Sequence, residues 1–167
     1  MRLRRVLVGI DGSAAGGAAA RWAAGAVDDA GEVIAVHGAG THLIRQAVAD
    51  AANGLGMFPF SRNWREELME EWCRPLRASG VTYRTVWSDA DPVDALLHNA
   101  RRADVDLLVI GHDADTGFLH RLVQGLRDDL IDHAKRPVVV VPFDPSSGEQ
   151  WLAPGLEGSR RSAPAPR

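Results

Sequence analysis

The chain is poor in several kinds of residue, and each shortage excludes a class of protein. Cys73 is the only cysteine among the 167 residues, so no disulfide can form within the chain, and we expect a reducing, cytoplasmic location. A net charge of −3 provides no basic surface for nucleic acid. No apolar run reaches membrane-spanning length, and the run after the basic start ends at Asp11, too early for a signal peptide. We therefore expect neither a nucleic-acid partner nor a membrane partner.

Motifs of common catalytic sites are also missing. The sequence has no G-x-x-x-x-G-K-[ST] phosphate loop, no histidine pair with zinc-ligand spacing and no nucleophile elbow. The run Gly38-Ala-Gly40-Thr-His-Leu43 begins like a dinucleotide-binding loop, but leucine replaces the third glycine, so a turn is the better interpretation. Asp11-Gly12-Ser13 matches the end of a D-x-D-G-T phosphotransferase signature, but Gly9 replaces its first aspartate. We predict that the protein is not an enzyme.

Five short runs rich in β-branched residues alternate with helical segments. These runs are Val6–Ile10, Val33–Val36, Val81–Trp87, Leu107–Ile110 and Val138–Val141. Three of them are almost continuously apolar, as in strands that are covered on both faces, whereas Val81–Trp87 is mixed and indicates a strand nearer an edge. The β-α-β-α pattern predicts an α/β fold with an open five-stranded parallel sheet and helices on both faces.

The helical segments carry recognisable start and stop signals. Asp91 is expected to cap a helix whose first residue is Pro92. Asn63 and Glu66 predict a capping box at the start of a helix over residues 64–78, which Pro75 should kink or end. One more helix is predicted by a shared apolar face that comprises Ala18, Trp22, Ala23, Ala26 and Val27.

Two segments have weaker signals. Residues 42–60 contain a short helical pattern that glycines and a proline interrupt, and their role stays open. From Asp144 onward, Pro, Gly, Ser and Arg dominate and periodicity is lost, so we expect an α/β domain over residues 1–143 and a disordered tail over residues 144–167. Trp64 and Trp72 are separated by two steps of four residues and therefore lie on one helical face. We interpret them as core residues rather than as a ligand-stacking surface.

Two strand ends, far apart in the sequence, carry the candidate site. Ligands of open parallel sheets bind outside the carboxyl ends of strands where the strand order reverses, so Asp11 and Gly111 are expected to line one crevice. The Asp11 carboxylate could accept hydrogen bonds from an adenine or a ribose, or Asp11 or Ser13 could simply cap the next helix. His112, Asp113 and Asp115 are hard ligands that could hold a divalent cation, but a solvated loop is the simpler interpretation, and we predict no metal site.

Taken together, these elements resemble the universal stress protein family. The resemblance rests on Val6-Leu-Val-Gly-Ile-Asp-Gly-Ser13, Val33-Ile-Ala-Val-His37, Asp91-Pro92, Asp106-Leu-Leu-Val-Ile-Gly111, Gly117-Phe118 and Arg136-Pro-Val-Val-Val-Val-Pro142. It implies a Rossmann-like fold of the adenine nucleotide alpha-hydrolase type, with strand order 3-2-1-4-5 and a cleft between strands 1 and 4. It also implies nucleotide-binding positions at Gly9, Ile10, Asp11, Val36, Ile110, Gly111 and Gly125.

The phosphate loop departs from that of the ATP-binding members, which carry G-x2-G-x9-G-[ST] after strand 4. Here the four positions hold Gly111, Ala114, Gln124 and Gly125, so only the first one matches. The resemblance thus implies a stress-response protein with a degenerate cleft for ATP, AMP or another adenine nucleotide, with Mg²⁺ or Mn²⁺ if bound, that acts as a non-catalytic sensor or regulator. The alternatives are a homodimeric scaffold without nucleotide and, more weakly, a metal-assisted phosphohydrolase.

A valine-rich edge strand predicts a partner. Val138, Val139, Val140 and Val141 carry no charge that would prevent another chain from pairing with the edge. Pairing of this strand with its copy would close a twofold dimer, as the family resemblance also implies. The alternative is that the tail covers the edge, with Trp151 and Leu152 as its apolar anchors.

Overall fold

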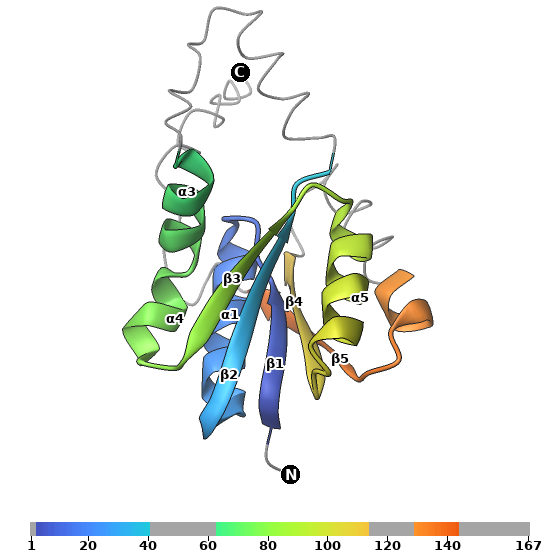
Figure 1. The fold of residues 1–167 in the computed structure, drawn as a ribbon. Coiled ribbons are helices and arrows are strands. Elements are labelled where there is room, and N and C mark those ends of the chain that lie inside the picture. The colour runs from blue at the N-terminus through green and yellow to red at the C-terminus, as the bar shows by residue number, and fades with distance from the viewer. Residues whose placement is uncertain (1–2, 41–62, 114–128, 144–167) are drawn as a thin grey trace, which may run out of the picture.

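The computed structural model describes residues 3–40, 63–113 and 129–143 (Figure 1). Its strands form one five-stranded sheet in the order β3-β2-β1-β4-β5, and every neighbouring pair is parallel. The strands are β1 (Leu3–Gly9), β2 (Val27–Gly38), β3 (Tyr83–Ser88), β4 (Leu107–Asp113) and β5 (Val138–Phe143). The predicted fold class and strand order are confirmed, and Val81–Trp87 does correspond to an edge strand.

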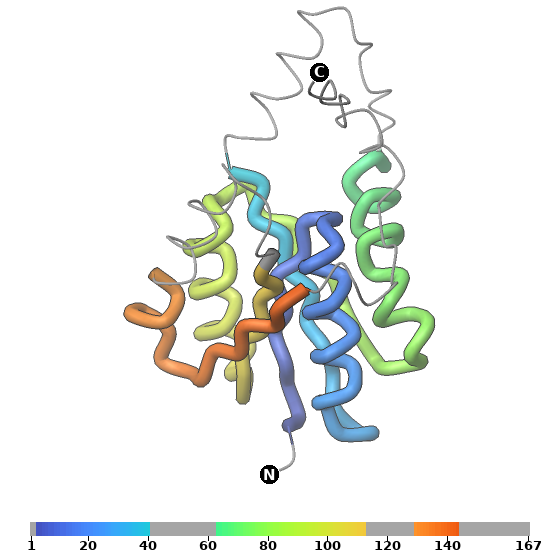
Figure 2. The backbone as a smooth tube through the Cα atoms, turned by 180° about the vertical axis from the view of Figure 1, so that it is seen from behind, coloured from blue at the N-terminus to red at the C-terminus, as the bar shows by residue number. Residues whose placement is uncertain are grey.

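Helices cover both faces of the sheet (Figures 1 and 2). One face carries α1 (Ala14–Ala26), α3 (Trp64–Trp72) and α4 (Arg74–Ser79), and the other carries α5 (Pro92–Arg102) and the helical residues 129–133. Consecutive side chains of β1 alternate between the two faces of the sheet. Val6 and Val8 pack toward α1 and Leu7 packs toward α5, and all three are fully buried. The apolar strands are thus buried on both faces, as their composition predicts.

The buried face of α1 differs from the prediction. Trp22 is 40% exposed, and the helix instead buries small residues, which are Ala15, Gly16, Gly17, Ala19, Ala20 and Ala23. Val27 lies outside α1, at the start of β2. The reason is the close packing of α1 on the sheet, which leaves room for alanine and glycine but not for an indole ring.

Pro75 ends α3 as predicted, and α4 begins with Pro75 in its first turn. The predicted capping box is wrong, because Asn63 precedes α3 with φ −111° and ψ 10° and its side chain makes no capping hydrogen bond. Asp91 does occupy the N-cap position of α5, with Pro92 next, but its side chain makes no capping bond either. The residue types at these positions therefore predicted where α3 and α5 begin. The side-chain hydrogen bonds that we expected there do not form.

Asp106 fastens the amino ends of the two central strands. Its Oδ2 accepts hydrogen bonds from the backbone amides of Arg4 at 2.7 Å and Arg5 at 2.9 Å, and its own amide donates to the Arg5 carbonyl. These bonds hold the pKa of Asp106 below its usual value. In the segments that the structure describes, no helix is long and apolar enough to span a membrane. The expectations for residues 42–60 and for the tail lie outside the described residues.

Candidate functional site

The hydrogen-bonded pairing of the two central strands, β1 and β4, ends near their carboxyl ends. Hydrogen-bonded register between β1 and β4 runs from Val6–Leu107 to Val8–Val109 and stops there. Beyond that point β1 stays paired with β2 up to Gly9–Val36, and β4 stays paired with β5 up to Asp113–Phe143. The strand order also reverses between β1 and β4, so this is where a doubly wound sheet opens a crevice for a ligand.

The turn after β1 lies at the carboxyl end of the sheet, where a ligand crevice is expected. Ser13 caps α1, because its Oγ accepts a hydrogen bond from the Gly16 amide at 3.0 Å. Asp11 Oδ1 in turn accepts from the Ser13 hydroxyl at 2.5 Å and from the Ser13 amide at 3.0 Å. The bond to the hydroxyl is charge-assisted and short. Ser13 is therefore the capping residue, and Asp11 holds the Ser13 side chain in place through these bonds. Asp11 itself remains exposed at the turn.

The tip of β4 lies directly against the first turn of α1. A Cβ atom placed on Gly111 would be 2.2 Å from the Ala15 carbonyl oxygen and 2.8 Å from the Gly16 amide nitrogen. Only glycine permits this approach of two backbones. Since Gly16 is the residue that Ser13 caps, the Asp11 turn and the Gly111 strand end lie side by side, as expected from the sequence.

The other predicted positions divide between the two faces of the sheet. Gly9 faces the α5 layer, where its Cβ would lie 3.4 Å from Leu96 and 3.6 Å from Ile110, and Val36 is buried in the same layer. Ile10 is buried toward α1, and its amide donates to the Val36 carbonyl at 3.0 Å. The Val36 carbonyl is thus engaged within the sheet. Gly125 lies outside the described residues.

An aromatic cluster borders the Asp11 turn, and sequence reasoning missed it. The His37 ring centroid lies 4.8 Å from that of Trp72 on α3 and 4.6 Å from that of Trp87 on β3. Trp72 also reaches the turn, because a Cβ on Gly12 would lie 2.4 Å from its Nε1. The one available signal was the strand alternation, which places His37 on the same face as Val33 and Ala35. The core interpretation of Trp72 is confirmed, because this residue is only 7% exposed.

His112 and Asp113 form the end of β4, and Asp115 lies outside the described residues. Within residues 3–40, 63–113 and 129–143, no group of three or more His, Cys, Asp or Glu side chains is placed to hold a metal ion.

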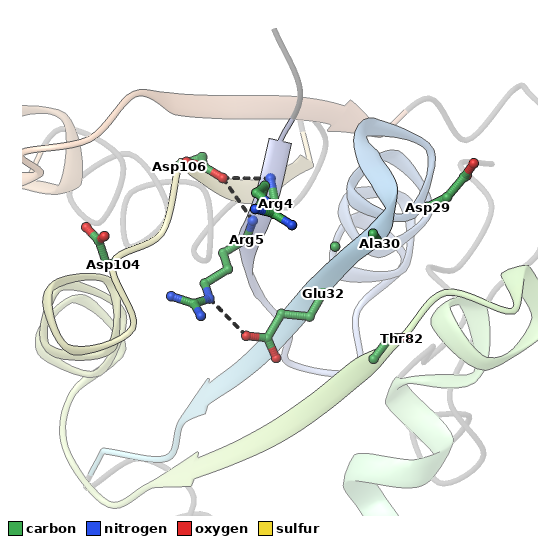
Figure 3. Close-up of a pocket in the computed structure, with 9 residues that line it drawn as sticks. Arg4, Arg5, Asp29, Ala30, Glu32, Thr82, Asp104 and Asp106 are labelled. Carbon is green, nitrogen blue, oxygen red and sulfur yellow. Dashed lines mark hydrogen bonds and ion pairs between the residues drawn. The ribbon is translucent and has the colours of Figure 1, made fainter.

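A concavity of about 650 Å³ lies at the opposite, amino end of the sheet (Figure 3). It is lined by Arg4, Arg5, Glu32, Asp104 and Asp106 among others. Two of its charges pair with each other, since Arg5 lies 3.2 Å from Glu32, and Asp106 binds the β1 amides. Ligands of parallel sheets bind at the carboxyl ends of the strands, so this concavity is not the expected site despite its size.

The fold is that of a doubly wound α/β protein whose strand order reverses between β1 and β4. The profile of the universal stress protein family matches residues 2–142. The chain belongs to the universal stress protein family. A comparison with curated protein sequences finds no significant match.

Solved structures share this fold at low sequence identity. Hypothetical protein MJ0577 is 16% identical with a TM-score of 0.63, over 87% of this chain and 99% of that one. A universal stress protein in complex with cAMP is 20% identical with a TM-score of 0.58, over 86% of this chain and all (100%) of that one. A family member from Arabidopsis thaliana with AMP bound is 15% identical with a TM-score of 0.55, over 85% and 93%.

Proposed function

We propose that this protein binds an adenine nucleotide in the crevice between β1 and β4 and acts as a non-catalytic sensor or regulator in the cytoplasmic stress response. The observation that carries the proposal is that the pairing of β1 with β4 ends at Val8 and Val109 and that the Asp11 turn and Gly111 follow side by side. Family membership and the neighbours solved with cAMP and AMP support the choice of an adenine nucleotide.

The loop sequence favours a ligand with one phosphate over a triphosphate. Ala114, Gln124 and Gly125 replace the glycines and the hydroxyl that hold phosphates in ATP-binding members. The sequence also carries two carboxylates next to the loop positions, Asp113 and Asp115. Two like charges at 4 Å repel by about 4 kcal/mol at an effective dielectric constant of about 20. Each added phosphate increases this repulsion unless Mg²⁺ or Mn²⁺ accompanies it.

Isothermal titration calorimetry with AMP, cAMP and ATP, each with and without Mg²⁺, tests the proposal. We expect AMP or cAMP to bind and Asp11→Ala to weaken that binding at least about tenfold, which corresponds to 1.4 kcal/mol. Asp29→Ala, at an exposed position at the other end of the sheet, is the matched control and should leave the affinity unchanged. No heat with any nucleotide, together with no adenine released by acid from freshly purified protein, would reject nucleotide sensing.

The loop argument has its own test. The triple variant Ala114→Gly, Gln124→Gly and Gly125→Ser restores the residue types of the ATP-binding loop, and we expect it to create or tighten ATP binding. An unchanged ATP affinity in the folded variant would refute the loop argument while leaving AMP binding untouched.

A homodimer is the second part of the proposal, and the edge strand β5 supports it. Val139 and Val141 pack toward α1, and Val138 and Val140 pack toward α5, yet all four are only half-buried. Pairing with a second copy would cover their exposed area and the unpaired backbone of the edge.

Light scattering coupled to size-exclusion chromatography tests the dimer. We expect a dimer for the wild type and a monomer for Val140→Lys. Thr85→Lys, on the opposite edge strand β3, should stay dimeric. A wild-type monomer at all concentrations, or equal dissociation of both variants, would reject pairing through β5.

A further inference from the structure

His37 is an imidazole buried in an aromatic cluster, at the carboxyl end of β2. It is 6% exposed and is the only buried polar or charged side chain among the described residues. The indole of Trp72 meets its ring at an interplanar angle of 64° and the indole of Trp87 at 51°. Both contacts are edge or tilted contacts, which aromatic rings prefer over face-to-face stacking.

The two ring nitrogens of His37 have different surroundings. Nδ1 lies 2.8 Å from the Ile10 carbonyl oxygen, so Nδ1 must carry a proton and donate it there. Nε2 is buried and has no hydrogen-bond partner within the part of the chain that the structure describes. The neutral ring leaves only an unpaired acceptor. The protonated ring would bury a cationic N–H without an acceptor, which costs far more.

Few charged groups surround His37. Among the described residues, Asp11 on the β1 turn is the one anion whose charge favours the protonated ring. On the α3 and β3 side, Arg65 forms an ion pair with Asp89 at 3.3 Å and lies 5.4 Å from the Trp87 ring centroid. The buried face of α1 consists of alanine and glycine. Within the described residues, the Ile10 carbonyl and Asp11 are thus the groups that offset the cost of burying a charge.

The weakest wall around His37 is α3. Of its nine residues, only Met69 and Trp72 are buried, and the side chain of the N-cap residue Asn63 makes no capping bond. The strands on the other sides are paired along their length. Trp72 is the residue through which α3 contacts both the His37 ring and Gly12. Movement of α3 is therefore the least costly way to bring water to Nε2.

We propose that His37 makes α3 an acid-sensitive wall of the crevice: uptake of a proton at Nε2 releases α3 and withdraws Trp72 from the Asp11–Gly12 turn. While the His37 ring is neutral, α3 stays packed and Trp72 stays in contact with the turn; we call this the closed state. Acidification then opens the side of the crevice that adjoins the turn, so the protein gains a response to pH in addition to any response to nucleotide. This device needs no bound ligand, and it stands or falls separately from the proposed function.

The direction of the pH effect follows from burial. Burial lowers the pKa of His37 below its usual 6.5, while the Ile10 carbonyl and Asp11 oppose this shift. The unfolded chain therefore binds the proton at higher pH than the closed state does. The closed state is fully favoured above about pH 6.5 and loses stability as the pH falls toward the lowered pKa.

The test combines two measurements on protein without nucleotide. Nitrogen NMR of the ¹⁵N-labelled imidazole reports the tautomer and the protonation of His37, and hydrogen exchange by mass spectrometry reports protection of residues 64–72. We expect a proton on Nδ1 at pH 7.5, and a loss of protection in α3 that follows the protonation of His37, by about tenfold for each pH unit below 6.5. His37→Gln, which has no titrating ring, should keep α3 protected at the same acidic pH.

His98→Gln is the matched control, because His98 is exposed on α5 on the other face of the sheet. It should lose α3 protection as the wild type does. The proposal is overturned if His37 becomes protonated while α3 stays protected, if α3 opens equally in His37→Gln, or if His37 does not titrate above pH 4.5. Should His37→Gln fail to fold, the two wild-type titrations still decide, because the proposal requires them to coincide.

Discussion

Gly111 offers the most direct test of the crevice, because its missing side chain is what lets β4 reach α1. In Gly111→Ala the new Cβ would lie 2.2 Å from the carbonyl oxygen and 2.3 Å from the carbonyl carbon of Ala15. Both obstructing atoms belong to the backbone of a helix, so no side chain can rotate away. The first turn of α1 and the tip of β4 must therefore move apart by about 1.2 Å to restore ordinary contact.

The cost of this movement can be estimated. Overpacking a well-packed interior costs about 1–3 kcal/mol, and we expect about 3 kcal/mol here because the obstruction is backbone. For a domain of this size, 1 kcal/mol corresponds to about 3 °C in Tm, so Tm should fall by about 10 °C. Gly25→Ala is the matched control, because it lies on α1 with nothing within 4 Å of the new Cβ. It should stabilise the protein by about 0.5–1 kcal/mol through helix propensity and chain entropy.

Urea unfolding followed by circular dichroism at 222 nm, together with thermal melts, measures both variants. The two alanines are chemically identical and differ only in what surrounds them. If Gly111→Ala were as stable as the wild type, the tip of β4 would not lie on α1. The shared crevice of Asp11 and Gly111 would then lose its basis, and so would the proposed nucleotide site.

Three further predictions concern single side chains. Asp106→Ala should destabilise the protein by about 1–2 kcal/mol at pH 7, because two backbone amides of β1 lose their acceptor. The fold lowers the pKa of Asp106, so the stability difference between wild type and Asp106→Ala should be full above about pH 4, the ordinary pKa of aspartate. The difference should disappear as the pH falls through the pKa of Asp106 in the folded protein. Urea titrations at pH 7 and pH 3 would show this loss. Ser13→Ala should cost about 1 kcal/mol through loss of the α1 cap, and Ser13→Thr, which keeps the hydroxyl, should recover most of it; equal stability of all three proteins would contradict the capping role. Burial raises the pKa of the Cys73 thiol to about 12, so a thiol reagent at pH 8 should label it only after unfolding, and rapid labelling of the native protein would be inconsistent with this burial.

Much of the fold follows from local pattern. Continuous apolar runs such as Leu107–Ile110 predicted strands buried on both faces, and the alternation of strands with helices predicted a parallel sheet. Pro75 marked the end of α3, and Ser13 marked the start of α1. These signals are readable from sequence because backbone sterics and strand composition act within a few residues of one another.

The sequence by itself therefore determined the elements, the class of sheet and the two strand ends where a ligand would bind. Only the tertiary structure decided which side chains surround that place. It turned Trp22 outward and the small residues of α1 inward, because Gly111 brings β4 against the helix backbone. It also brought the His37 ring into contact with the Trp72 ring. These residues are 35 positions apart in the sequence, so no local pattern encodes their contact. Periodicity specifies which residues can be buried, whereas the distance between packed backbones decides which of them fit.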